Sequence, residues 1–130
     1  MLAGPGVGQF FAELGADVIK VENLTAGGDV TRTWKSAGEV TDDRSAYFCS
    51  VNWGKRSIAV DLNTAEGKEI VQKLASSSDI LIASFKPGDA EKLKVDYPTL
   101  SRINPGLIYG QTTGYGSQNP RVGYDAITQA

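Results

Sequence analysis

Two lysines and a Pro-Gly turn stand together after a run of apolar residues in the second half of the chain. Lys86 and Lys92 flank the turn Pro87-Gly88, which leads into a predicted helix. An ammonium group beside the backbone N–H groups of a helix N-terminus can neutralise a phosphate dianion. The pattern therefore predicts an anion site at this turn. The alternative is that both lysines are solvated surface charges.

Polar residues also follow the other predicted strands. They form the segments Glu22-Asn23, Asp61–Asn63 and Thr112–Gly116, and Ser84–Gly88 is the fourth segment of this kind. In an open parallel sheet, ligands bind beyond the carboxyl ends of the strands. All four segments are therefore candidate binding loops.

Glycines near the N-terminus allow a different hypothesis. Gly4, Gly6 and Gly8, with Glu22 further on, have some features of a dinucleotide fingerprint, in which glycines let the backbone approach a pyrophosphate and an acid holds a ribose. The spacing is GxGxG instead of GxGxxG, and no strand precedes it. The alternative is that these glycines and Pro5 only shape the start of a helix.

Composition excludes several classes of site. With no His and a single Cys, these residues cannot form a zinc site, a His-based catalytic triad or an internal disulfide. Cys49 lies in the apolar run AYFCSV and is predicted to belong to the core. A net charge of -2 gives no broad basic field for nucleic acid. No apolar run approaches the roughly 20 residues that span a bilayer, so we predict neither a nucleic-acid nor a membrane partner.

The first predicted elements are a helix over residues 7–14 and a strand over residues 17–22. Val7, Phe10, Phe11 and Leu14 have the spacing of one helical face, and Gly15 ends the helix. The β-branched residues of the strand suit a mostly buried, parallel position. Because such a helix normally follows an earlier strand of the same sheet, we expect the chain to begin one element late, with Met1 marking a truncation.

Strands and helices alternate over the rest of the chain. Residues 57–62 and 79–83 are predicted strands joined by a helix over 64–76, in which Asn63 and Glu66 form a capping box. Such a βαβ unit has parallel strands. A turn that includes Lys55-Arg56 precedes it. Short helices over 89–94 and 97–103, a strand over 107–111 and a helix from 124 follow. The fold class is α/β, a Rossmann-like open parallel sheet with flanking helices, incomplete at both ends, in one partial domain over residues 1–130.

Six segments stand in a characteristic order: LAGPGVGQFFAELGADVIKVE over 2–22, GGDVTRTW over 27–34, NWGKRSIAVDL over 52–62, SFKPG over 84–88, NPGLIYG over 104–110 and GYDAITQA over 123–130. In this order they resemble the N-terminal portion of family III coenzyme A transferases, the formyl-CoA transferase and CaiB-like group. Within the family, TRTW and NWGKRSIAVDL are most similar to members that use succinyl-CoA and handle dicarboxylates.

The resemblance implies an enzyme that moves coenzyme A between carboxylic acids, with an acyl-CoA thioester as substrate and no further cofactor. An Asp carboxylate attacks the thioester, so the exchange passes through an acyl-aspartyl anhydride and an aspartyl thioester. The resemblance places that Asp beyond Ala130, so we expect no catalytic residue in this chain and no activity from it alone. Family members form interlocked homodimers, located in the cytoplasm or in mitochondria.

The resemblance also implies which residues meet the substrate. Tyr124 occupies the position where racemases of the same superfamily carry the His of a GHD motif, so it is expected in the active-site wall and favours transfer over racemisation. Lys92 matches a basic phosphate contact, and Ser84 and Phe85 match the Asn-Phe of the usual ENF motif. The full set of expected coenzyme A contacts is Leu2, Ala3, Asn23, Val60, Asn63, Ser84, Phe85, Lys86, Lys92 and Leu93.

Two other classes of function remain open at this stage. The chain could be a nucleotide-binding or interaction module without chemistry, or, through the glycines near the N-terminus, part of an NAD-dependent oxidoreductase. An acyl-CoA racemase is a third alternative, against which the identity of Tyr124 argues.

Overall fold

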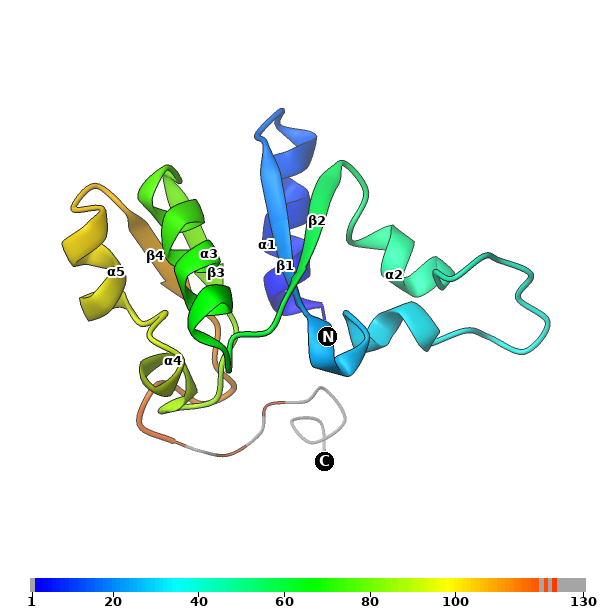
Figure 1. The fold of residues 1–130 in the computed structure, drawn as a ribbon. Helices are drawn as coiled ribbons and strands as arrows, with labels where there is room; N and C mark the ends of the chain where they lie inside the picture. The colour runs from blue at the N-terminus through cyan, green and yellow to red at the C-terminus, as the bar shows by residue number, and fades with distance from the viewer. Residues whose placement is uncertain (1, 120, 122, 124–130) are drawn as a thin grey trace. The chain divides into compact units, whose positions relative to one another are not determined.

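The computed structural model describes residues 2–119, 121 and 123. The chain divides into two compact units, Met1–Asp61 (unit 1) and Leu62–Ala130 (unit 2). Each unit contains one parallel two-stranded sheet with its own helices (Figure 1). None of the helices in the described ranges is long and apolar enough to cross a membrane.

Unit 1 is built on a helix and two strands. Helix α1 (Ala3–Glu13) ends at Gly15, whose φ of +91° is the left-handed conformation that a glycine adopts without strain. Strand β1 (Val18–Asn23) then pairs in parallel with β2 (Lys55–Val60), and α1 packs on both strands (Figure 1). Parallel pairing places the carboxyl ends of β1 and β2 at the same edge of the sheet.

The long connection between β1 and β2 has no regular sheet or long helix. It contains two 3₁₀ turns (Leu24–Ala26 and Val30–Thr33) and the short helix α2 (Ala46–Ser50). The side chain at the start of each element accepts a hydrogen bond from a backbone N–H group two or three residues ahead; the capping residues are Asn23, Asp29 and Ser45. Local side-chain caps therefore shape this segment, for which the sequence showed no periodicity.

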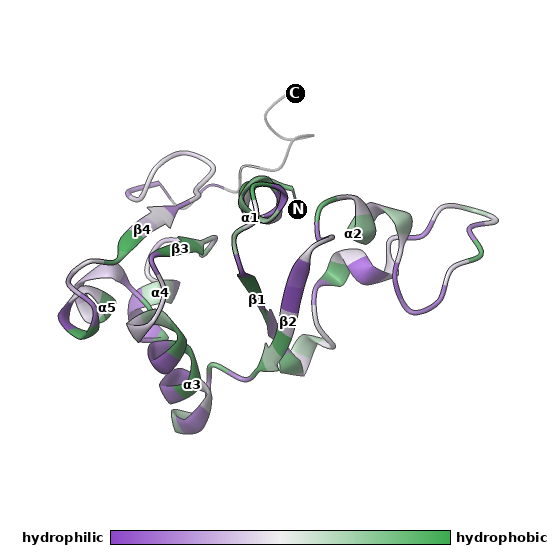
Figure 2. Cartoon of the chain, turned by 90° about the horizontal axis from the view of Figure 1, so that it is seen from above, coloured by the Kyte–Doolittle hydropathy of each residue, from purple (hydrophilic) through white to green (hydrophobic). Residues whose placement is uncertain are grey.

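Unit 2 alternates helices and strands more regularly. Its elements are α3 (Ala65–Ser76), β3 (Ile80–Ala83), α4 (Asp89–Lys92), α5 (Tyr97–Ile103) and β4 (Ile108–Gln111), and β3 pairs in parallel with β4. Helix α3 is amphipathic, with purple and green residues mixed along it in Figure 2, and it packs against α5. The buried side chains of this unit are mainly apolar and include Val71, Ala75, Ala83, Leu100 and Leu107.

The mixed α/β architecture with parallel strands is confirmed, and so are the predicted strands and the helices over 64–76, 89–94 and 97–103, within a few residues. The described strand pairs are β1 with β2 and β3 with β4, so the two strands of the predicted βαβ unit, β2 and β3, do not form one of the described pairs. Both observed pairs join strands linked by longer connections. The predicted helix from residue 124 lies outside the described residues.

The apolar face predicted for the first helix is largely uncovered: Phe10 and Leu14 are 59% and 70% exposed, because the strands contact the face of α1 that carries Gly8, where a side chain would meet Lys55. Two burial predictions for unit 1 were wrong. In β1, Ile19 and Val21 are 38% and 39% exposed, since the sheet has two strands in the described part of the chain. Cys49 is exposed, because in the short helix α2 the buried position falls on the neighbouring Phe48.

Two predictions about the ends of elements were also wrong. The N-cap of α3 is Thr64, whose hydroxyl oxygen accepts a hydrogen bond of 3.0 Å from the Gly67 N–H group, and Asn63 stands one position too early for that role. Lys55 and Arg56 are the first residues of β2 and not part of a turn. Gly54, with φ of +76°, ends the turn before them.

Candidate functional site

A cavity of about 370 Å³ opens in unit 2 beside the carboxyl end of β3. The strand leads into Phe85, and Gly88, with φ of +86°, starts helix α4. The single turn of α4 brings Lys92 and Leu93 to the cavity. The complete lining is Asn63, Lys68, Phe85, Asp89, Lys92 and Leu93.

Four of the ten expected coenzyme A contacts thus lie around one cavity: Asn63, Phe85, Lys92 and Leu93. Ser84 and Lys86 are exposed in the same loop but do not line it. Lys68 does line it, and the sequence reasoning missed this residue. The sequence offered only a weak indication for Lys68, namely its position in the first part of α3, the helix that follows the loop with Asn63.

The cavity of unit 2 carries two cations and one carboxylate. Lys92 Nζ lies 3.6 Å from Asp89 Oδ1, and the two side chains are 78% and 42% exposed. An exposed pair of this kind contributes little to stability, about 0–1 kcal/mol. Lys92 can therefore exchange Asp89 for a phosphate oxygen at low cost.

The remaining expected contacts lie in unit 1 and are not gathered in a cavity there. Leu2 and Ala3 begin α1 and are exposed. The Asn23 side chain accepts hydrogen bonds from Thr25 N (3.0 Å) and Thr25 Oγ1 (2.8 Å) and so caps a 3₁₀ turn. Val60 is buried at the end of β2. Tyr124 lies outside the described residues.

Unit 1 has a network of charged side chains that the sequence reasoning did not predict. Its centre is Glu22, which is only 5% exposed. The carboxylate accepts hydrogen bonds from Arg32 Nε (2.9 Å) and Nη2 (2.7 Å), from Asp29 N (2.7 Å) and from Ser57 Oγ (2.5 Å). The bidentate bond from Arg32 is the main cause that lowers the pKa of Glu22 to about 2.

Gly28 allows the loop to approach Glu22 this closely. Its φ is +98°, and a Cβ atom there would lie 2.7 Å from Glu22 Oε2. Beside this loop, Lys20 Nζ donates to Asp29 Oδ2 at 2.6 Å. The side chains of Lys20 and Glu22 lie on the same face of β1 because they are two residues apart. The spacing of Lys20 and Glu22 and the segment Gly27-Gly28-Asp29 were the features of the sequence from which the network around Glu22 could have been predicted.

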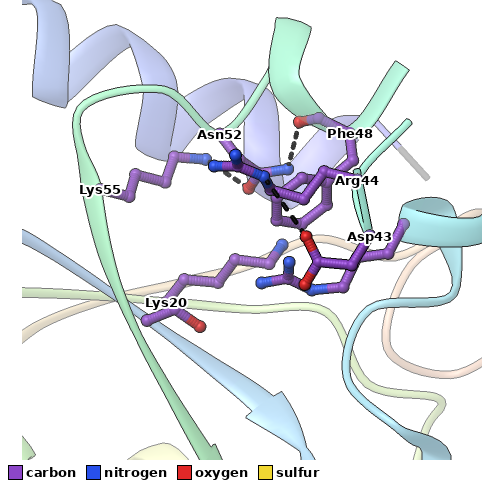
Figure 3. A pocket seen from close by; sticks show the side chains of 8 residues that line it. Lys20, Asp43, Arg44, Phe48, Asn52 and Lys55 are labelled. Atoms are coloured by element: carbon purple, nitrogen blue, oxygen red, sulfur yellow. Dashed lines mark hydrogen bonds and ion pairs between the residues drawn. The ribbon is translucent and has the colours of Figure 1, made fainter. Parts of the chain in front are cut away.

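A second cavity, of about 350 Å³, lies entirely within unit 1. Figure 3 shows the charged ends of Lys20, Arg44 and Lys55 directed toward the space beside the Phe48 ring. The Arg32 guanidinium stacks on the same ring, with its carbon 4.0 Å from the ring centroid. The complete lining is Lys20, Arg32, Asp43, Arg44, Phe48, Asn52, Lys55 and Ser57.

Lys55 is held in this cavity by neutral oxygen atoms. Its Nζ donates to Pro5 O (2.6 Å), Val51 O (2.5 Å) and Asn52 Oδ1 (3.2 Å), and among the described residues no carboxylate forms an ion pair with it. Burial, with a smaller contribution from the charge of Lys20, lowers the pKa of Lys55 to about 8. Gly8 leaves the space through which its side chain passes, since a Cβ atom there would lie 3.3 Å from Lys55 Cε.

The glycines near the N-terminus do not form a phosphate loop. Gly4, Gly6 and Gly8 all lie inside α1, and Gly8 serves the passage of Lys55. The structure therefore agrees with the interpretation that they shape a helix and disagrees with a dinucleotide fingerprint, which needs them in a turn before a helix.

The chain is similar to several known proteins. It is 44% identical over 136 residues to the succinate–glutarate CoA-transferase of Agrobacterium fabrum, covering 99% of this chain and 34% of that protein. It is 40% identical to the succinyl-CoA:glutarate CoA-transferase of Homo sapiens, covering 100% of this chain and 30% of that protein. The crystal structure of a CAIB/BAIF family protein from Brucella suis superposes with a TM-score of 0.90 at 46% identity, over 98% of this chain and 35% of that one.

The chain spans about a third of the length of these relatives. The model of the family described as CoA-transferase family III matches all of its residues, 1–130. The chain therefore belongs to CoA-transferase family III.

Proposed function

We propose that this chain supplies part of the coenzyme A site of an enzyme that transfers coenzyme A between an acyl-CoA and a carboxylic acid. The observation that carries the proposal is the cavity of unit 2, because it gathers residues expected to contact coenzyme A from two separate loops and adds a second cation. Family membership supports the same assignment.

The chemistry of the cavity suits the parts of coenzyme A. Lys68 and Lys92 can neutralise phosphate groups, while Phe85 and Leu93 offer apolar surface to a base or to the pantetheine arm. Asp89 competes with phosphate for Lys92, but the exposed pair is weak. A ligand with phosphates next to apolar surface is therefore the best match.

The proposed reaction is an exchange of thioester for carboxylate. The carboxylate of an Asp, which we place outside this chain, attacks the thioester carbonyl; the C–S bond breaks, and coenzyme A leaves as a thiolate from an acyl-aspartyl anhydride. The thiolate attacks the aspartyl carbonyl, releasing the donor acid and forming an aspartyl thioester. The acceptor carboxylate then attacks the aspartyl thioester and expels coenzyme A as a thiolate, which leaves a new acyl-aspartyl anhydride. The thiolate attacks the acceptor acyl carbonyl of this anhydride, so that the acceptor acyl-CoA forms and the Asp carboxylate is released. Because two of its relatives are CoA-transferases that act on succinate or succinyl-CoA and on glutarate, we propose a small dicarboxylyl-CoA such as succinyl-CoA as donor.

Binding tests the role of the cavity directly. Calorimetric titration of the chain with coenzyme A should show saturable binding, weakened about tenfold or more by Lys68→Ala and by Lys92→Ala, because each removes a charge-assisted contact of about 1.5–3 kcal/mol. Lys73→Ala is the matched control: it removes the same charge from the last turn of α3, away from the cavity. Tighter binding of NAD than of coenzyme A, or equal losses in all three variants, would contradict the assignment.

Activity tests the transferase itself. In a full-length protein that contains these 130 residues, Lys92→Ala should raise the KM for succinyl-CoA more than it lowers kcat, because a phosphate contact remote from the thioester contributes uniform binding. Coenzyme A binding without any transfer to glutarate or other acids would favour a binding module over an enzyme.

The proposal includes a homodimer of the full-length protein. The exposed apolar side chains of Phe10 and Leu14 on α1 support it, since such surface is stabilised when another part of the protein or a second copy covers it. The molar mass of the full-length protein in solution, from light scattering, tests this point, and a monomer would contradict it.

A further inference from the structure

We propose that the cavity of unit 1 binds the carboxylate group of a small carboxylic acid, held by Lys20, Arg32 and Arg44 beside Lys55. This site lies within unit 1 and shares no residue with the coenzyme A cavity of unit 2. It does not depend on the transferase proposal.

The cations of this cavity retain hydrogen-bond donors. Arg32 uses Nε and Nη2 on Glu22, and Arg44 uses Nε and Nη2 on Asp42. Among the described residues, Nη1 of each guanidinium has no acceptor, and Lys20 Nζ has only Asp29. A planar carboxylate can accept from several such donors at once.

Lys55 favours the binding of one negatively charged group in the cavity of unit 1. It is the one lining cation that forms no ion pair with a carboxylate in the described part of the chain, and Lys20 repels its charge. A half-buried cation of this kind gains stability when an anion enters its surroundings.

The charges nearby argue for one carboxylate group and against a dianion such as phosphate. Four cations, Lys20, Arg32, Arg44 and Lys55, face three carboxylates that pair with them at 2.5–2.7 Å, Glu22, Asp29 and Asp42, so one further negative charge balances the cavity. A second negative charge would therefore meet repulsion without a further cation. Asp43 is 85% exposed and lies 3.7 Å from Arg44, so it can move aside for the ligand.

The cavity also has a suitable size and wall. At about 350 Å³ it is at the small end of ligand pockets, which usually measure about 300–1,000 Å³. The Phe48 ring adds an apolar wall to the charged groups. A short carboxylic acid, with one charged end and an apolar stem, matches both features.

Titration of the full chain with acetate and with succinate tests the proposal. With ionic strength held constant by chloride, the backbone amide signals of Phe48 and Ser57 should shift saturably with either acid in NMR spectra. The ¹³Cε signal of Lys55 should titrate at a higher pH when the site is filled, since a nearby anion favours the ammonium form. Arg44→Gln should weaken the binding about tenfold. The matched control, Arg56→Gln, removes an Arg from β2 outside the cavity, 67% exposed against 51% for Arg44, and should leave the affinity unchanged.

Several results would overturn the proposal. Shifts that do not saturate, or that phosphate or chloride reproduces at the same concentration, would mean that the site has no preference for a carboxylate. Equal losses in Arg44→Gln and Arg56→Gln would mean that only the net charge of unit 1 matters. If the titration of Lys55 did not change when the acid binds, the acid would be bound outside this cavity.

Discussion

The two units differ in what they bury. Among the described residues, unit 1 buries the polar side chains of Gln9, Glu22, Thr31, Ser45 and Asn52 but only two apolar ones, Phe48 and Val60. Unit 2 buries seven apolar side chains and a single polar one, Asp96. Unit 1 is thus held together largely by hydrogen bonds and ion pairs around an irregular connection, and unit 2 by apolar packing between helices and strands. The same charge substitution should therefore have different consequences in the two units.

The largest expected effect is on unit 1. Glu22→Gln should destabilise it by about 3–5 kcal/mol, because removing one partner of a buried ion pair leaves the Arg32 charge uncompensated. Hydrogen exchange of the β1 and β2 amides, compared with those of β3 and β4, reports on each unit separately.

The control for this comparison is an ion pair in unit 2. Asp89→Asn breaks the exposed pair with Lys92 and should cost less than about 1 kcal/mol. Similar losses from Glu22→Gln and Asp89→Asn would mean that the units do not differ in the role of their charges.

Acid should act on unit 1 through the same carboxylate. Because the pKa of Glu22 is lowered from 4.5 to about 2 in the folded state, its contribution to stability is complete above pH 4.5 and is lost as the pH falls toward 2. The unfolding free energy of unit 1 should therefore decrease between pH 4.5 and 2, measured by urea denaturation followed by hydrogen exchange. In Glu22→Gln this part of the pH dependence should disappear. If the unfolding free energy of the variant fell with pH in the same way, groups other than Glu22 would cause the pH dependence.

Substitutions of two neighbouring glycines should have an intermediate effect and distinguish close packing on Glu22 from the conformation of the loop itself. Gly28→Ala should cost more than about 2 kcal/mol, because the new Cβ atom would lie 2.7 Å from Glu22 Oε2 in addition to the unfavourable positive φ. Gly27→Ala is the matched control: its φ is also positive, at +71°, but its Cβ atom would meet nothing within 4 Å, so it should cost only about 1 kcal/mol. Equal losses in thermal unfolding would argue against close packing on Glu22.

The contrast between the units also explains what the sequence could predict. In unit 2, apolar periodicity marks the elements, and the loop after β3 follows from the rule that ligands bind at strand ends. These patterns predict a binding loop there, whereas the assignment of Phe85 and Lys92 to one coenzyme A site came from the resemblance to the family. Lys68 could not be assigned to it, because nothing in a helix sequence tells which lysine faces a cavity.

In unit 1, the important contacts join residues far apart in the sequence. Lys55 reaches Pro5, fifty residues away, and Arg32 reaches Glu22 only because a glycine bends the intervening loop. No local pattern specifies such contacts. The apolar face of α1 shows a related limit of local patterns: periodicity identifies such a face but does not say what will cover it.

The smallest expected effect lies in unit 2 and concerns the start of α3. Thr64→Ala should destabilise this unit by about 1 kcal/mol, because the Gly67 N–H group loses the hydroxyl acceptor that caps the helix. Thr64→Ser is the matched control, since it keeps a hydroxyl group at the N-cap and should retain most of the stability. The measurement is hydrogen exchange of the α3 amides, with those of β1 and β2 as an internal reference. A loss of similar size in Thr64→Ser would mean that the methyl group of Thr64, and not the cap, stabilises the helix. A loss that extends equally to β1 and β2 would mean that the two units unfold together, and the difference in what they bury would then have no separate consequence for their stability.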